Sequence, residues 1–166
     1  MNDVQPSTAP APPPTRGKLY RIWQGFWLTF LVGSLAYAWY CFYVPSNEIA
    51  WADDYTTAQQ QAVEADKPML LFFTGPWCVP CRIMKRQVFA DDEVRATVNA
   101  SFVPVTIDLD DSKADATVSH FGVGATPSTL ITDSQGTVLQ WRQGGMSKAD
   151  FLAWIGELDP AAAEGL

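Results

Sequence analysis

The chain has 166 residues, of which 48% are hydrophobic and 17% are charged, and this length favours one compact domain with a smaller element beside it. Its formal net charge is −7, and from Glu48 onward 8 Lys and Arg residues stand against 17 Asp and Glu residues. Because nucleic acids and anionic lipid surfaces are themselves negatively charged, this acidity argues against both as partners and leaves other proteins.

The first 45 residues differ in composition from the rest of the chain. Residues 1–18 contain five prolines and almost no large apolar side chain, which predicts a disordered cytoplasmic tail. Residues 22–44 carry no charge, and such a stretch can cross a hydrocarbon core of ~30 Å as a helix. We therefore predict a transmembrane signal-anchor helix over residues 19–45 and a folded domain over residues 46–166.

The charges around the apolar segment predict its orientation. Arg16, Lys18 and Arg21 precede it, whereas acidic residues follow it and the next cation is Lys67. The positive-inside rule then keeps the N-terminus in the cytoplasm and places the folded domain on the outer side of the membrane. A cleaved signal peptide is the alternative, since residues 36–38 resemble a small-residue cleavage site, but the apolar stretch is longer than a usual core of ~7–15 residues.

Beyond the anchor, periodicity and turn residues predict alternating helices and strands. Helices are expected over residues 55–66, 78–88, 92–100, 113–121 and 148–158, and strands over residues 69–74, 102–107, 128–132 and 138–141. Asp91 and Ser147 stand where helix N-caps are expected, and the last two strands should form a hairpin around residues 133–136. This order predicts an α/β fold with a mixed central sheet and helices on both of its faces.

The motif Trp77-Cys78-Val79-Pro80-Cys81, close behind the apolar run 69–73, is the most informative part of the sequence. Two side chains at i and i+3 of a helix lie about 5–6 Å apart, within the Cα separation of ~4.4–6.8 Å that a disulfide tolerates. If the helix begins near Cys78, unpaired N–H groups there favour its thiolate, so Cys78 is predicted to be the exposed nucleophile. Cys81, one turn deeper, is predicted to be the buried resolving thiol. The redox-active disulfide itself would serve in place of a cofactor.

Two other uses of the cysteine pair fit the sequence less well. A structural zinc site needs about four ligands, yet outside the pair the chain contains only Cys41 and His120 as further cysteine or histidine, so no metal is predicted. A purely structural disulfide would close so short a loop that it would constrain the unfolded chain only weakly. The aspartates at 108, 110 and 111 lack the spacing of a calcium loop and are expected to be a solvated strand end and a helix cap.

Two stretches carry a resemblance to a known family. Residues 73–82, FTGPWCVPCR, are similar to the active-site signature of the thioredoxin superfamily, and Thr126-Pro127 stands where that family carries a cis-proline beside the dithiol. The resemblance covers residues 54–158 and implies the thioredoxin-like fold, with one N-terminal transmembrane helix added here. It also implies that Thr126 and Pro127 form a wall against which a partner strand docks, and Trp77 is expected to add contact surface beside the thiols.

Residues 88–94, VFADDEV, resemble in particular the C-terminal periplasmic domain of the DsbD reductant conductors. That resemblance implies a membrane-anchored protein-disulfide oxidoreductase, held in the bacterial inner membrane with its domain in the periplasm or outside the cell. Its partners would be disulfide-containing proteins and a membrane electron donor of the DsbD type. The implied direction is reduction, in cytochrome c biogenesis or isomerase upkeep.

The sequence departs from these relatives at two positions. Many of them carry a buried aspartate where this chain has Phe72, and the DsbD domain carries a glutamate where this chain has Lys85. If Lys85 leans toward the thiols it would favour a thiolate. The favoured alternative is that Arg82, Lys85 and Arg86 form a solvated face that complements the C-terminus of the helix.

Other functions of the dithiol stay open at this point. An oxidase or isomerase could use the same two cysteines, and a copper- or haem-handling module could use them as soft ligands. A non-catalytic adaptor would need neither. The direction of electron flow distinguishes a reductase from an oxidase or isomerase. Stoichiometric Cu(I) binding would identify a copper-handling module.

Overall fold

The computed structural model describes residues 17–158 of the chain. It divides into two compact units, Met1–Tyr43 and Val44–Leu166. Residues 1–16 of the predicted disordered tail and residues 159–166 of the predicted domain lie outside the described residues.

The first unit contains a single described helix, α1 (Lys18–Phe42), of 25 residues with none of them buried. Within residues 17–158 it is the helix long and apolar enough to cross a membrane. The hydroxyls of Thr29 and Ser34 donate to the carbonyls of Gly25 and Phe30 at 2.9 and 2.8 Å, so these polar groups are satisfied within the helix, as a lipid environment demands. The helix ends before Pro45, which disfavours helical geometry in the residue ahead of it.

The second unit is built on a four-stranded sheet in the order β2-β1-β3-β4. Strand β1 (Met69–Thr74) pairs in parallel with β2 (Val103–Asp108) and antiparallel with β3 (Ser128–Thr132), which continues antiparallel into β4 (Val138–Gln143). The predicted mixed sheet and its terminal hairpin are thus confirmed. Strand β1 lies in the centre of the sheet, which explains why all six of its residues are buried, because both of its faces are covered.

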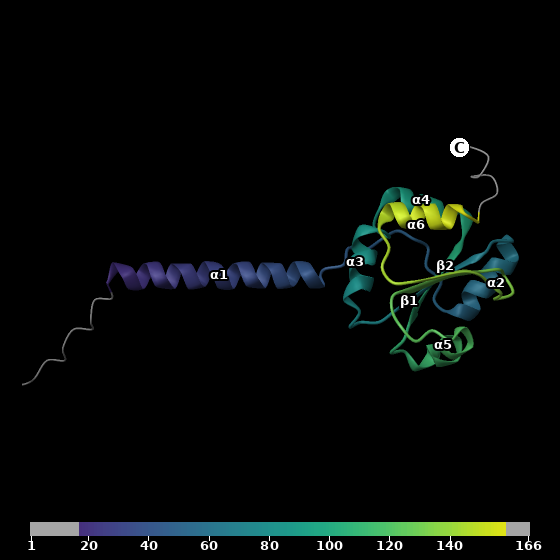
Figure 1. The fold of residues 1–166 in the computed structure, drawn as a ribbon, viewed down its shortest axis with the longest axis horizontal. Coiled ribbons are helices and arrows are strands. Elements are labelled where there is room, and N and C mark those ends of the chain that lie inside the picture. The colour runs from purple at the N-terminus through teal and green to yellow at the C-terminus, as the bar shows by residue number, and fades with distance from the viewer. Residues whose placement is uncertain (1–16, 159–166) are drawn as a thin grey trace, which may run out of the picture. The chain divides into compact units, whose positions relative to one another are not determined.

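Helices cover both faces of the sheet, as predicted (Figure 1). They are α2 (Tyr55–Ala65), α3 (Val79–Gln87), α4 (Asp92–Ser101), α5 (Asp115–Phe121) and α6 (Lys148–Gly156). Leu70 and Phe72 of β1 join one buried cluster with α3, α4 and α6, which we call the dithiol-side core because it includes both cysteines of the pair. The alternate residues of β1 join a second cluster with α2 and α5.

One predicted helix differs from the observed structure. Residues 113–121 were expected to be a single helix, but a short 3-10 turn, η1 (Ser112–Ala114), precedes α5. The side chain of Asp111 accepts a hydrogen bond from the N–H of Lys113 at 3.0 Å, so the predicted helix cap is confirmed and lies on this turn. A cap at that position favours tight 3-10 geometry before the α-helix begins.

The predicted N-caps of α4 and α6 are confirmed, and ion pairs connect the first turns of the two helices. Asp91 accepts from the N–H of Glu93 at 3.0 Å, and Ser147 accepts from the N–H of Asp150 at 3.2 Å. The ammonium of Lys148 lies 2.9 Å from carboxylate oxygens of both Asp91 and Glu93. This hydrogen bond from Lys148 is the main reason why the pKa of Asp91 is lowered below its ordinary value.

This lowered pKa predicts an acid-dependent loss of stability. A carboxylate whose pKa is lower in the folded state stabilises the fold at every pH above its unfolded value near 3.8, and loses that contribution as pH falls through the folded value. We expect Asp91→Asn, which retains a capping side chain, to lower the urea midpoint of the full chain in detergent at pH 7. The gap to the wild type should shrink at pH 3, and an equal gap at both pH values would contradict the prediction.

Candidate active site

The two cysteines of the motif lie at the N-terminus of α3 and are joined in a disulfide with a Cα separation of 5.3 Å. Cys78 is the N-cap of the helix, and its Sγ accepts a hydrogen bond from the N–H of Cys81 at 3.2 Å. Pro80 lies in the first turn, where its missing N–H leaves no helical hydrogen bond unmade. The helix start predicted near Cys78 is therefore confirmed.

The burial of the pair differs in part from expectation. Cys81 is fully buried, as predicted, but Cys78 is only 2% exposed. The expectation of an exposed Cys78 is wrong for this disulfide form, because its sulfur turns onto the helix end to meet Cys81. Exposed apolar surface is supplied instead by the neighbours on either side, Trp77 at 58% and Val79 at 54%.

Trp77 is held in place by two residues from different segments. A Cβ added to Gly75 would lie 3.0 Å from the indole ring, which is closer than most Cβ contacts, so the glycine allows the ring to lie close to the backbone. The indole N–H donates to the carboxylate of Asp110 at 3.1 Å. Asp110 was not expected at the site from the sequence. Its place just beyond β2 was the available signal, because β2 runs parallel to β1 and their C-terminal ends meet at one edge of the sheet.

The predicted proline is linked to the first turn of α3 through residues 144–145. The Thr126–Pro127 peptide bond is cis, as predicted, and Pro127 is buried directly before β3. Its carbonyl accepts from the N–H of Gly144 at 2.8 Å, and a Cβ on the next residue, Gly145, would lie 4.0 Å from Cβ of Pro80. The segment 144–145 therefore connects the two predicted parts of the site. The hydroxyl of Thr126 is buried without a hydrogen-bond partner in the described part of the chain.

Lys85 does not lie on a solvated face. Its side chain is half-buried, and its Nζ lies 6.0 Å from the centroid of the Phe72 ring. Burial lowers the pKa of Lys85, and the carboxylate of Asp108 opposes that effect. The favoured expectation for this residue is therefore wrong, because an apolar ring at position 72 offers a surface on which the lysine stem and ammonium can rest.

Residues 17–158 contain no group of three or more His, Cys, Asp or Glu side chains that could hold a metal ion. The cysteine pair is thus the chemically reactive feature of the site. A thiol pair of this kind exchanges disulfides by attack of a thiolate on a sulfur–sulfur bond.

Comparison with known proteins identifies the family. The model of the thioredoxin-like domain family matches residues 55–159, which is more than half of the chain. The chain belongs to this family. It is a thioredoxin-like disulfide oxidoreductase whose redox centre is the Cys78–Cys81 pair, and proteins with such a pair use no separate cofactor.

Relatives of the chain include two kinds of protein. The thiol:disulfide interchange protein DsbD of Ralstonia nicotianae is 34% identical over 99 residues, which cover 58% of this chain and 16% of that protein. The thioredoxin of Haemophilus influenzae is 30% identical over 95 residues, covering 57% of this chain and 83% of that protein. The chain thus spans less than a fifth of the length of that DsbD.

Among solved structures, the C-terminal domain of Neisseria meningitidis DsbD in the oxidised form superposes with a TM-score of 0.53 at 21% identity. The match covers 65% of this chain and 98% of that domain. At such identity the likeness shows the fold alone. The predicted thioredoxin-like fold is confirmed.

Proposed function

We propose that the chain is a membrane-anchored reductase that opens disulfides in extracytoplasmic partner proteins. The observation that carries this proposal is the Cys78–Cys81 pair at the start of α3, set between the exposed side chains of Trp77 and Val79. These two side chains place exposed apolar surface beside the pair, where a partner protein can dock. The names of the DsbD relatives, thiol:disulfide interchange proteins, support exchange as the chemistry.

The proposed reaction begins with the reduced pair. The Cys78 thiolate attacks one sulfur of the partner disulfide, so that a mixed disulfide forms and the second partner sulfur leaves as a thiolate. Cys81 then attacks Sγ of Cys78, which restores the internal disulfide and releases the partner with both sulfurs reduced. Capping of α3 by Cys78 favours the first step, because the helix N-terminus stabilises a thiolate.

The proposed docking surface consists of Trp77, Thr126 and Pro127. Trp77 supplies an exposed apolar ring held by Asp110. Thr126 is partly exposed and directly precedes Pro127, so a partner backbone can contact this residue. The N–H of Gly144 donates a hydrogen bond to the carbonyl of Pro127, which holds the backbone at Pro127 in place.

The proposed location is the bacterial inner membrane, with α1 as a single-pass anchor. Its length, its apolar composition and its internally satisfied hydroxyls support a membrane environment. The cations that precede it support a cytoplasmic N-terminus and a periplasmic or extracellular domain. A domain outside the cytoplasm needs a source of electrons, so we include a membrane donor of the DsbD type among the partners. Cytochrome c biogenesis is a process that would consume the reductant.

The direction of electron flow is tested by the thiol state of the pair in cells. We expect Cys78 and Cys81 to be largely reduced in cells that contain a DsbD-type donor and oxidised in cells that lack it. Cells are quenched in acid, and the free thiols are alkylated and counted by mass in a Cys41→Ser background. A C-terminal alkaline phosphatase fusion reports in the same cells whether the domain lies outside. An oxidised pair in both strains would indicate an oxidase. An inactive phosphatase would contradict the proposed topology, because it would place the domain in the cytoplasm.

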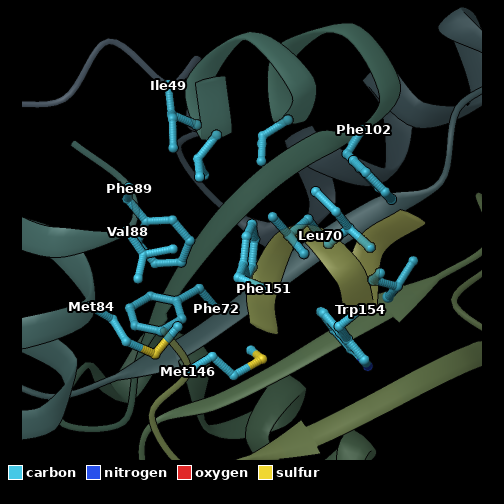
Figure 2. Close-up of a cluster of buried hydrophobic side chains, with 14 of the residues drawn as sticks. Ile49, Leu70, Phe72, Met84, Val88, Phe89, Phe102, Met146, Phe151 and Trp154 are labelled. Carbon is cyan, nitrogen blue, oxygen red and sulfur yellow. The ribbon is translucent and has the colours of Figure 1, made fainter. Parts of the chain in front are cut away.

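A Cu(I) carrier is the second candidate, and one observation favours it. The sulfur side chains of Cys78, Cys81, Met84 and Met146 all belong to the dithiol-side core, and Figure 2 shows both methionines there with their sulfurs in yellow. Thiolates and thioethers are the ligands that Cu(I) prefers. Stoichiometric Cu(I) binding by the reduced chain, without reduction of insulin disulfides, would favour this function over the reductase.

A further inference from the structure

Lys85 lies on the same face of α3 as the resolving cysteine. Residues four apart on a helix have Cβ atoms about 5–6 Å apart, and Cys81 and Lys85 have this spacing. The face they share is turned to the interior, because Cys81 is fully buried and Met84 between them is 1% exposed. The ammonium of Lys85 lies over the Phe72 ring, and Phe72 belongs to the same dithiol-side core as Cys81.

We propose that Lys85 is a positioning residue for disulfide exchange, whose ammonium group stabilises the Cys81 thiolate that the resolving step requires. The inference rests on the exchange proposed at Cys78 and Cys81, but not on its direction. It assigns this task to the chain's own lysine, because the residues of the dithiol-side core supply no cation.

The surroundings of Cys81 explain why such help is needed. A thiol buried among apolar groups resists ionisation, and the members of its core contributed by α4, β3 and α6 are apolar: Val94, Val98, Ile131, Phe151, Trp154 and Ile155. Strand β1 carries no ionisable side chain. The charged group that faces Lys85 from β2 is the carboxylate of Asp108, and the cations nearest to it along α3 are Arg82 and Arg86.

The Lys85 ammonium and the Cys81 thiolate stabilise each other. Burial disfavours the charged form of Lys85 and lowers its pKa, so a nearby anion relieves part of that cost. The Cys81 thiolate supplies such an anion at the moment of resolution. In that step the thiolate attacks Sγ of Cys78, the internal sulfur–sulfur bond forms, and the bond to the partner sulfur breaks with its electron pair. The proton released earlier by Cys81 goes to water, and Lys85 keeps its own proton throughout.

The test measures the ionisation of Cys81 in the full chain. With Cys78 replaced by Ser, the rate at which Cys81 reacts with iodoacetamide is followed against pH by mass spectrometry. Lys85→Met should raise the midpoint by about one pH unit, a tenfold change in the ionisation constant, and Lys85→Arg should restore it. The matched control is Lys67→Met, which removes the same charge at the opposite end of β1 and should leave the midpoint unchanged.

A kinetic readout separates this role from a merely structural one. With both cysteines present, release of a mixed disulfide at neutral pH should be about threefold slower in Lys85→Met for each unit of pKa, because a more basic thiolate is also a better nucleophile. At pH values above both midpoints the variant should instead be about threefold faster, because both thiols are then ionised and the more basic thiolate attacks faster. An unchanged midpoint in Lys85→Met, or an equal shift in Lys67→Met, would overturn the inference. Failure of the wild type to exchange insulin disulfides would instead overturn the proposed function.

Discussion

Cys81→Ser is expected to accumulate covalent complexes with partner proteins, whereas Cys78→Ser should accumulate few or none. Attack by Cys78 forms the mixed disulfide, and without Cys81 nothing inside the chain releases it. The remaining sulfur of Cys78→Ser lies one turn inside α3 and is fully buried, so it has no access to a partner. We expect the yield of complexes to differ at least tenfold between the two variants, an excess that non-reducing gels can measure.

The burial of Cys78 makes this experiment more demanding than the sequence alone suggested. In the disulfide form its side chain is 2% exposed, so partner access requires that opening of the disulfide frees the sulfur from Cys81. The double variant Cys78→Ser/Cys81→Ser is the control for non-specific capture, and Cys41→Ser in every background removes the third cysteine. Equal trapping by the two single variants, or trapping by Cys78→Ser alone, would contradict the assigned roles. Mass spectrometry of the trapped proteins would identify the substrate class.

The elements that sequence reasoning predicted well are those set by local chemistry. Asp91 and Ser147 begin helices where their side chains were expected to cap, because a cap needs only the next three backbone N–H groups. The apolar run of residues 69–73 indicated the strand β1 for a similar reason, because a short apolar run followed by turn residues is typical of a buried strand. The position of the dithiol at the start of α3 follows from these two kinds of signal.

The features that sequence reasoning missed depend on contacts between distant segments. Lys85 is half-buried because its ammonium packs over the ring of Phe72, which lies on another element. Asp110 joins the site because β2 lies beside β1 and carries it to Trp77. Helical spacing alone placed Lys85 on the face of Cys81, but it could not show whether that face was covered. Such contacts are decided by packing, which periodicity along the chain does not contain.

Phe89→Ala should cost about 3–5 kcal/mol of unfolding free energy, the usual range for removing a buried phenylalanine. Phe89 is fully buried and makes edge-on ring contacts with three aromatic residues. Its ring centroid lies 5.3 Å from that of Trp51, 4.8 Å from that of Phe72 and 5.4 Å from that of Phe151. Figure 2 shows Phe72, Phe89 and Phe151 gathered in the dithiol-side core.

The size of this effect follows from what the ring joins. Phe151 comes from α6, Phe72 from β1 and Trp51 from the segment ahead of α2, so Phe89 holds together three parts of the fold that are distant in sequence. Edge-to-face pairs contribute about 0.5–1.5 kcal/mol each beyond their buried area, and the cavity left by alanine adds to their loss. Phe89→Leu, which keeps most of the volume, should cost less than about 1.5 kcal/mol.

Chemical denaturation of the full chain in detergent, followed by near-ultraviolet circular dichroism, measures the difference. Val63→Ala is the matched control, because Val63 is 55% exposed on α2 and its loss should change stability by less than about 0.5 kcal/mol. A cost for Phe89→Ala close to that of the control would mean that the aromatic contacts do not hold the core together. Because Phe72 both contacts Phe89 and carries Lys85 on its ring, we also expect Phe89→Ala to disturb the ionisation of Cys81, whereas Val63→Ala should leave it unchanged.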